Sequence, residues 1–266
     1  MTHSSTTLRT SDQADATGAV LMTALPSERQ LTELHVARAT QLKLAPAARC
    51  IFPELVLQQE VHPASELSGD LIDYLQLADG SVLFCLADMA GHGTHAALFT
   101  PLLKATFRSM QAESGAVSLD QCLRTFASVL AATQTGTHAA MCLGVVSMDR
   151  TQVRIAGAAQ FPPPLLCTND GCQVLEVIGK PLGLFPDAHY AESCFDFPAG
   201  ARLLVFSDGI LDVLEGDDEL RLSTLCDRVG DASGSCADVL ARIGVDLSVS
   251  RLDDIACLLI ARESVT

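Results

Sequence analysis

The sequence predicts an α+β fold, a four-layer α/β/β/α sandwich in which helices flank two stacked, mainly antiparallel β-sheets. Roughly ten short β-like runs fall into two groups along the chain, and a pair of helical patterns follows each group. Neighbouring runs are joined by turn residues, as in hairpins, which indicates antiparallel pairing. Because each sheet must bury one face, we expect the sheets to stack on each other and the helices to cover their outer faces.

Three segments follow from the pattern along the chain. Residues 1–26 are rich in Ser, Thr, Asp and Ala without periodicity, so we expect a flexible arm. Residues 27–47 contain a helix from Ser27 to Leu44, which a proline stops. This helix either packs on the domain or is a regulatory handle that binds a partner or forms a homodimer, and the sequence leaves both open. Residues 48–266 form the main domain.

The first group of strands lies shortly after that helix. Asp79-Gly80 stands between its last two members and is a hairpin signal. Two helices follow the group, and Ser118 is an N-cap for the second, with Gln121 at the capping-box position. The expected strands are 55–61, 71–77 and 82–87, and the expected helices are 95–111 and 118–133.

The second group follows these helices and completes the two sheets. Asp149-Arg150 separates its first two strands, and two short helices precede the last strand. The expected strands are 141–148, 152–158, 165–167, 173–177, 193–197, 202–206 and 255–261. The expected short helices are 219–229 and 236–245.

The composition is that of a globular chain and excludes two kinds of partner. Apolar residues make up 48% of 266 residues, which supports a real core. No apolar run approaches the roughly 18 residues of a membrane span, and the first residues are polar, so we expect no export signal and no membrane anchor. The formal net charge is −15, so we expect no nucleic-acid partner and no membrane partner.

The ten cysteines are expected to be reduced, as in a cytoplasmic protein. Cys167 and Cys172 have four residues between them and no second pair at zinc-ligand spacing, which argues against a zinc site. Free cysteines behave as small hydrophobic residues in apolar strands. Four cysteines lie in such strand-like runs: Cys85, Cys142, Cys194 and Cys257.

Aspartates stand at the ends of several apolar runs. Asp88 ends one run and leads into Met89-Ala90-Gly91-His92-Gly93, a turn that brings a carboxylate, free backbone N–H groups and a histidine to one edge. Any one such aspartate is explained as an ordinary turn residue, but their combination indicates a site. The others are Asp70, Asp208, Asp253 and Asp254.

Converging carboxylates would require a counter-charge, because like charges raise one another's pKa. Arg251 is the nearest basic residue to any of these aspartates along the chain. All-oxygen ligation favours Mg²⁺ or Mn²⁺ over zinc. Two such ions ~3.5–4 Å apart would activate a water nucleophile and neutralise a phosphoryl group.

Six motifs in order resemble the metal-dependent type 2C (PPM) protein serine/threonine phosphatases, in their bacterial SpoIIE/RsbU-like branch. The chain departs from the usual pattern at Ser68, Gln160 and Ala256, but all four family carboxylates are present. The motifs are Ser68-Gly69-Asp70 with Asp73-Tyr74, Asp88 to Gly93, Phe161 to Leu166, Lys180 to Phe185, Phe206 to Gly209, and Asp253-Asp254-Ile255.

The resemblance implies two Mn²⁺ or Mg²⁺ ions and a ligand set. Asp88 would bridge the ions, and Asp208 would help to complete the shell of one of them. The remaining ligands would be Asp70, the carbonyl of Met89, and Asp253 or Asp254, a choice that the sequence leaves open.

The same resemblance implies the catalytic roles. Asp88 and Asp208 would act through the metals, and a water would attack phosphorus without a phosphoenzyme. His92 would be the general acid for the leaving serine oxygen, or would merely shape the turn.

The function implied is hydrolysis of phosphoserine or phosphothreonine on a signalling protein, a small anti-sigma-factor antagonist. An alternative is a non-catalytic module of the same pathway that only binds its partner. A third reading is a histidine-kinase-like ATPase, whose Asp-x-Gly-x-Gly motif differs from this turn by one residue. That ATPase needs an upstream Asn, whereas Asn169, the only Asn, lies downstream.

Overall fold

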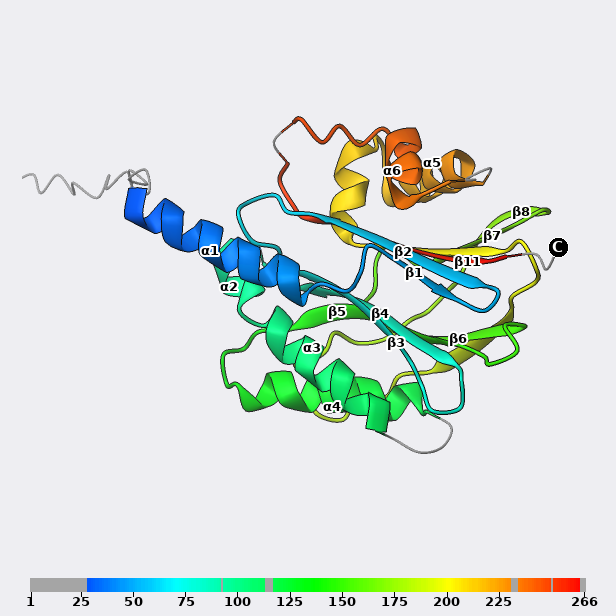
Figure 1. Cartoon of the computed structure of the whole chain (residues 1–266), viewed down its shortest axis with the longest axis horizontal. Coiled ribbons are helices and arrows are strands. Elements are labelled where there is room, and N and C mark those ends of the chain that lie inside the picture. Colours follow the sequence, from blue (N-terminus) through cyan, green and yellow to red (C-terminus); the bar gives the residue numbers. More distant parts are fainter. Residues whose placement is uncertain (1–27, 92, 113–116, 231–233, 250, 264–266) are drawn as a thin grey trace, which may run out of the picture.

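The computed structural model describes residues 28–91, 93–112, 117–230, 234–249 and 251–263. It has the four layers that the sequence predicts, with two antiparallel sheets between two layers of helices (Figure 1). The arm expected at residues 1–26 lies outside the described residues. Within the described ranges, no helix is long and apolar enough to cross a bilayer.

The two sheets are antiparallel throughout their registers, as the hairpin signals predict. The turns at Asp79-Gly80 and Asp149-Arg150 join paired neighbours. The six-stranded sheet has the order β1 (Arg49–Phe52), β2 (Leu55–His62), β11 (Ile255–Arg262), β10 (Arg202–Phe206), β7 (Leu165–Thr168) and β8 (Gly171–Val174). The five-stranded sheet has the order β3 (Asp70–Gln76), β4 (Val82–Met89), β5 (Ala139–Val146), β6 (Gln152–Ala158) and β9 (Glu192–Asp196).

The helices cover the outer faces of the sheets. Helices α3 and α4 lie over the five-stranded sheet, α5 and α6 lie over the six-stranded sheet, and α1 extends from one side (Figure 1). Two short 3₁₀ helices, η1 (Met110–Ala112) and η2 (Asp208–Val213), complete the set. The α-helices are α1 (Glu28–Leu44), α2 (Gly93–Ala97), α3 (Thr100–Ser109), α4 (Leu119–Ala132), α5 (Asp218–Val229) and α6 (Cys236–Ile243).

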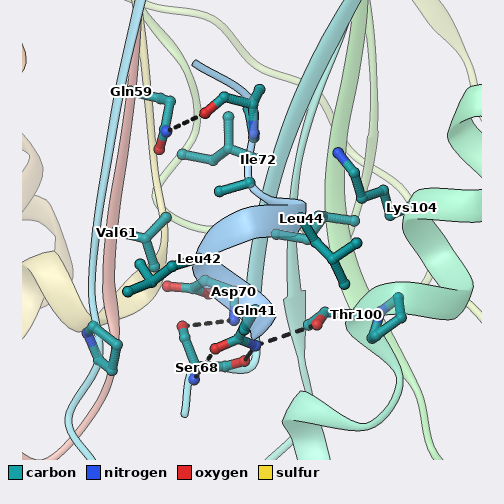
Figure 2. Close-up of a pocket in the computed structure, with 15 residues that line it drawn as sticks. Gln41, Leu42, Leu44, Gln59, Val61, Ser68, Asp70, Ile72, Thr100 and Lys104 are labelled. Carbon is teal, nitrogen blue, oxygen red and sulfur yellow. Dashed lines mark hydrogen bonds between the residues drawn. The ribbon is translucent and has the colours of Figure 1, made fainter. Parts of the chain in front are cut away.

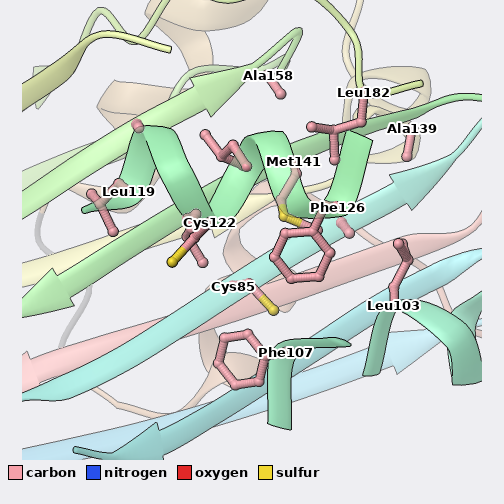
Figure 3. Close-up of a cluster of buried hydrophobic side chains, with 14 of the residues drawn as sticks. Cys85, Leu103, Phe107, Leu119, Cys122, Phe126, Ala139, Met141, Ala158 and Leu182 are labelled. Atoms are coloured by element: carbon pink, nitrogen blue, oxygen red, sulfur yellow. The ribbon is translucent and has the colours of Figure 1, made fainter. Parts of the chain in front are cut away.

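Three apolar clusters separate the four layers. One lies between the two sheets, and one lies between the six-stranded sheet and α5 with α6. The third packs Phe107 of α3 and Phe126 of α4 against Cys85 and Met141 of the five-stranded sheet (Figure 3). Burying aromatic and aliphatic side chains on both faces of each sheet is the main stabilising contribution. The rigid sheets therefore hold the ends of their strands in fixed relative positions.

Several predicted elements differ from the structure, as one helix and two strands illustrate. The helix expected at 95–111 is wrong as one element, because Pro101 lies in the first turn of α3 and starts a new helix after α2. Strand β1 was not predicted, since it is a short edge strand that buries none of its residues. Strand β8 begins and ends earlier than the expected 173–177.

Candidate metal and active site

The antiparallel registers bring four strand ends to one edge of the sandwich. Asp70, the first residue of β3, is the direct partner of Asp88 near the end of β4. Asp208 follows the end of β10, and Asp253 precedes the start of β11, which pairs with β10. In an antiparallel pair the end of one strand lies beside the start of its neighbour, so aspartates far apart in sequence meet here.

A pocket of about 230 Å³ opens at this edge. Asp88, Asp208 and Asp253 line it together with the backbone turn that follows β4. His138 and Pro181 form other parts of its wall. Among the described residues that line the pocket, none is Lys or Arg. The negative charges of the pocket are therefore not compensated by basic side chains in its lining.

Asp70 is buried beside Asp88 and lines the neighbouring pocket of Figure 2. Among the described residues, neither of its carboxylate oxygens has a hydrogen-bond partner. The nearby hydroxyl of Ser207 donates to the carbonyl oxygen of Asp254 instead (3.3 Å). Burial, followed by the charge of Asp88, raises the pKa of Asp70 well above its ordinary value. A buried carboxylate with two unpartnered oxygens is costly unless a cation or a proton satisfies it.

The pKa of Asp88 is raised by the same two causes, burial and neighbouring negative charges. Burial raises its pKa to about 8, with further contributions from the charges of Asp208 and Asp253. The pKa of Asp253 is raised as well, first by burial. Several carboxylates that resist ionisation at one place are a common feature of functional sites.

Asp254 has a different role from its neighbour Asp253. One of its carboxylate oxygens accepts from the backbone N–H of Ala64 (2.7 Å). The other accepts from the hydroxyl of Ser68 (2.9 Å) and the backbone N–H of Gly69 (2.7 Å). Asp254 therefore holds the loop that leads to Asp70, whereas Asp253 faces the pocket.

Two glycines allow the close approach of these segments. A Cβ on Gly69 would lie 2.9 Å from the Cβ of Ala96 in α2 and 3.5 Å from the carbonyl oxygen of Met89. A Cβ on Gly209 would overlap the carbonyl group of Asp254. The Met89 side chain lies in the apolar core, and its carbonyl oxygen is close to the loop of Asp70.

The donor set fits a hard divalent cation in its chemistry. Within the stretches that the structure describes, no three or more Asp, Glu, His and Cys side chains are grouped closely enough to hold a metal ion. The oxygens of Asp70 nevertheless need a positive partner, and Asp88 faces Asp70 across the strand pair. Carboxylate and carbonyl oxygens are the ligands that Mg²⁺ and Mn²⁺ prefer.

The histidine that the sequence singled out, His92, lies outside the described residues. His138, which belongs to none of the sequence motifs, lines the pocket. It precedes β5, and only the pairing of β5 with β4 brings it there. Gln160 donates to the carbonyl oxygen of Phe206 (2.7 Å), just before Asp208, and so supports the end of β10.

Comparisons with known proteins agree with this architecture. Residues 78–263 match the family model described as Stage II sporulation protein E (SpoIIE). The phosphoserine phosphatase RsbP of Bacillus subtilis (strain 168) is 28% identical over 185 residues, which are 68% of this chain and 45% of RsbP. The chain thus spans less than half the length of this relative.

Three solved structures share the fold. The SiaA-PP2C domain of Pseudomonas aeruginosa has a TM-score of 0.72 at 20% identity, over 89% of this chain and 98% of that one. The structure of the RsbU and RsbW domains of Rv1364c from Mycobacterium tuberculosis has a TM-score of 0.65 at 23% identity, and the match covers 80% of this chain and 61% of that one. The third structure is the catalytic domain of the serine threonine protein phosphatase PstP in complex with two manganese ions. Its TM-score is 0.57 at 16% identity, and the match covers 79% of this chain and 100% of that one.

The family match covers well over half of the chain, and the two stacked antiparallel sheets with flanking helices are those of the PP2C fold. Because the chain has this fold, the hypothesis of a histidine-kinase-like ATPase is wrong. The chain therefore belongs to the SpoIIE family of PP2C-type serine phosphatases.

Proposed function

We propose that the chain is a Mn²⁺- or Mg²⁺-dependent phosphatase that hydrolyses phosphoserine or phosphothreonine on a signalling protein. The observation that carries the proposal is the buried, unpartnered carboxylate of Asp70, which faces Asp88 beside Asp208 and Asp253. A set of acids that cannot all ionise alone is suited to bind divalent cations and, through them, a phosphoryl group.

The residues proposed to hold two ions are Asp70, Asp88, Asp208 and Asp253, with the carbonyl oxygen of Met89. When bound, such ions supply Lewis-acid neutralisation of phosphoryl oxygens and lower the pKa of water. Asp254 is proposed as a positioning residue rather than a ligand, because both its oxygens already accept hydrogen bonds.

The chain itself contributes rigidity and charge to this chemistry. The paired strands β3 and β4 fix Asp70 relative to Asp88, so little reorganisation is needed when the acids give up protons to bind cations. We keep His92 as the proposed proton donor to the leaving serine oxygen. His138 is a second side chain that can donate a proton into the same pocket.

Helix α1 is proposed as the regulatory handle of the phosphatase, through a partner or a second copy of the chain. Near its end, Gln41 donates to the carbonyl oxygen of Ser68 (2.8 Å) and accepts from the Ser68 N–H (3.1 Å), and Figure 2 shows the same side chain reaching Thr100 of α3. Ser68 lies two residues before Asp70, so a movement of α1 would shift the position of that aspartate through the hydrogen bonds of Gln41. Gln41→Ala should raise the Mn²⁺ concentration that activity requires, whereas the exposed control Thr40→Ala should leave it unchanged, and equal behaviour of the two would reject the role.

The substrate is proposed to be a phosphorylated small anti-sigma-factor antagonist. The similarity to RsbP, named a phosphoserine phosphatase, supports phosphoserine as the group that is hydrolysed, and the motif resemblance suggests the antagonist that would carry it. The predicted cytoplasmic location is supported by the ten free cysteines, all of which lie in the described ranges.

Hydrolysis of p-nitrophenyl phosphate tests the proposal. We expect turnover with Mn²⁺, none in EDTA, and recovery when Mn²⁺ but not Zn²⁺ is added back. Asp208→Asn should remove the turnover, and the matched control Asp149→Asn, in an exposed hairpin turn, should keep it. Full activity in EDTA would exclude the metal mechanism.

The alternative function is a module that binds its partner without catalysis. The lack of Lys and Arg among the described lining residues favours it, because a phosphate would find no permanently charged side chain of opposite sign there. Asp88→Asn separates the two cases. If Asp88→Asn hydrolyses a phosphoprotein in Mn²⁺ as fast as the parent, the phosphatase mechanism is refuted. If the parent itself is inactive and binds no Mn²⁺, the binding module is favoured.

A further inference from the structure

The β7–β8 hairpin and helix α5 bring three thiols together on the side of the molecule covered by α5 and α6. Cys167 and Cys172 are direct cross-strand partners, and their Sγ atoms lie 2.7 Å apart. Cys226 on α5 shares a side-chain hydrogen bond with Cys172. All three thiols are free, and they lie outside the lining of the pocket that contains Asp88. The proposed phosphatase chemistry does not use them.

The strand register gives Cys167 and Cys172 the backbone spacing of a disulfide. The N–H of Leu175 donates to the carbonyl oxygen of Pro164 (2.8 Å), and hydrogen-bonded pairs alternate with non-hydrogen-bonded pairs along an antiparallel ladder. Three positions further along the register, Cys167 and Cys172 form a non-hydrogen-bonded pair, with Cα atoms about 4.5 Å apart. Disulfides span Cα distances of roughly 4.4–6.8 Å, so the bond requires no strand movement.

The two partners differ in access to solvent. Cys172 is partly exposed, whereas Cys167 is buried, so an oxidant in solution reaches Cys172 first. The hydrogen bond with Cys167 raises the pKa of Cys172 to about 12. The Cys172 thiol is therefore protonated near neutral pH and reacts slowly with oxidants.

We propose that Cys167 and Cys172 are a redox modification site, at which hydrogen peroxide converts the two thiols into a reversible disulfide. The Cys172 sulfur attacks the peroxide, so that an S–O bond forms, the O–O bond breaks and one water leaves. The Cys167 sulfur then attacks the Cys172 sulfur, forming the S–S bond and breaking the S–O bond, and the oxygen leaves as water with the thiol proton. The sulfurs lose two electrons in all, which reduce one peroxide to two waters. A dithiol reductant restores both thiols by exchange.

Peptide mapping of the full chain tests the assignment. Trypsin places Cys167 and Cys172 in one peptide, residues 155–202, and Cys226 in another, residues 222–228. After treatment with hydrogen peroxide and alkylation of the remaining thiols, we expect the first peptide to lose two alkylation sites and the mass of two hydrogen atoms. Dithiothreitol should restore both sites.

Variants decide which thiols form the bond. Cys194→Ser removes the third, exposed thiol of the same peptide and should keep the internal disulfide, whereas Cys167→Ser should abolish it. The proposal is overturned if peptide 155–202 keeps all its alkylation sites after peroxide, or if Cys167→Ser loses two sites as the parent does. A cross-link between the two peptides would also overturn it, because the bond would then belong to Cys226.

Discussion

The substitution Asp88→Asn is expected to raise the free energy of unfolding of the metal-free chain. Burial, followed by the charges of Asp208 and Asp253, raises the pKa of Asp88 from 3.8 to about 8. Near neutral pH the folded chain therefore opposes ionisation of this carboxyl, whereas the unfolded chain does not. An amide of the same shape removes this opposition and can still donate a hydrogen bond to Asp208.

The size of the effect follows from the difference between the two pKa values. Each tenfold change in proton affinity corresponds to about 1.4 kcal/mol, so the rise of the Asp88 pKa from 3.8 to about 8 sets an upper limit of roughly 6 kcal/mol. A neighbouring aspartate relieves part of this by taking up the proton instead, because the carboxyls titrate as a group. We expect a gain of about 2 kcal/mol near pH 8, or about 4–8 °C in Tm for a domain of this size.

The gain has a defined dependence on pH. Since the pKa of Asp88 is higher in the folded chain, the folded chain holds a proton that the unfolded chain releases. The free energy of unfolding of the parent should fall as the pH rises from about 4 to about 8, and should then level off. Asp88→Asn lacks the part of this fall that Asp88 causes and keeps the parts due to Asp70 and Asp253, so the two curves should diverge over the same range.

Urea unfolding in EDTA at about pH 5 and about pH 8 measures the effect. The control is Asp149→Asn, an exposed hairpin residue whose pKa is lowered to about 2, first by its hydrogen bond with Ser147. That control should show no gain. Mn²⁺ should stabilise the parent and not Asp88→Asn. An Asp88→Asn protein less stable than the parent near pH 8 in EDTA, or a gain equally large near pH 5, would refute the reasoning.

Two further substitutions test the packing that supports the site. Asp73 is fully buried and bonded to Lys104 (2.6 Å) and Arg108 (2.7 Å) of α3, so Asp73→Asn should cost about 2 kcal/mol in urea unfolding, less than a fully buried pair because both cations are partly exposed. A loss below about 0.5 kcal/mol would show that this ion pair is not needed. Gly209→Ala should cost about 2 kcal/mol and weaken Mn²⁺-dependent activity, because its Cβ would displace the carbonyl of Asp254. Unchanged stability and activity would contradict that expectation.

Much of the fold was predictable because its signals are local. Alternating apolar runs and the Asp79-Gly80 turn identify the β3–β4 hairpin without knowledge of any distant residue. Ser118 is the N-cap of α4, and its side chain accepts from the N–H of Gln121 as the pattern indicated. Strand β1 could not be predicted, because a short edge strand with no buried residue has little hydrophobic pattern.

Which aspartates stand at strand ends can be read from the sequence, because an apolar run stops at each of them. Their separate roles depend on contacts between distant segments, which exist only in the folded chain. Asp253 lines the pocket, whereas Asp254 holds Ser68, 186 residues away along the chain. The sequence likewise does not reveal that the buried oxygens of Asp70 have no hydrogen-bond partner among the described residues, because burial and hydrogen bonding arise only when the two sheets pack together.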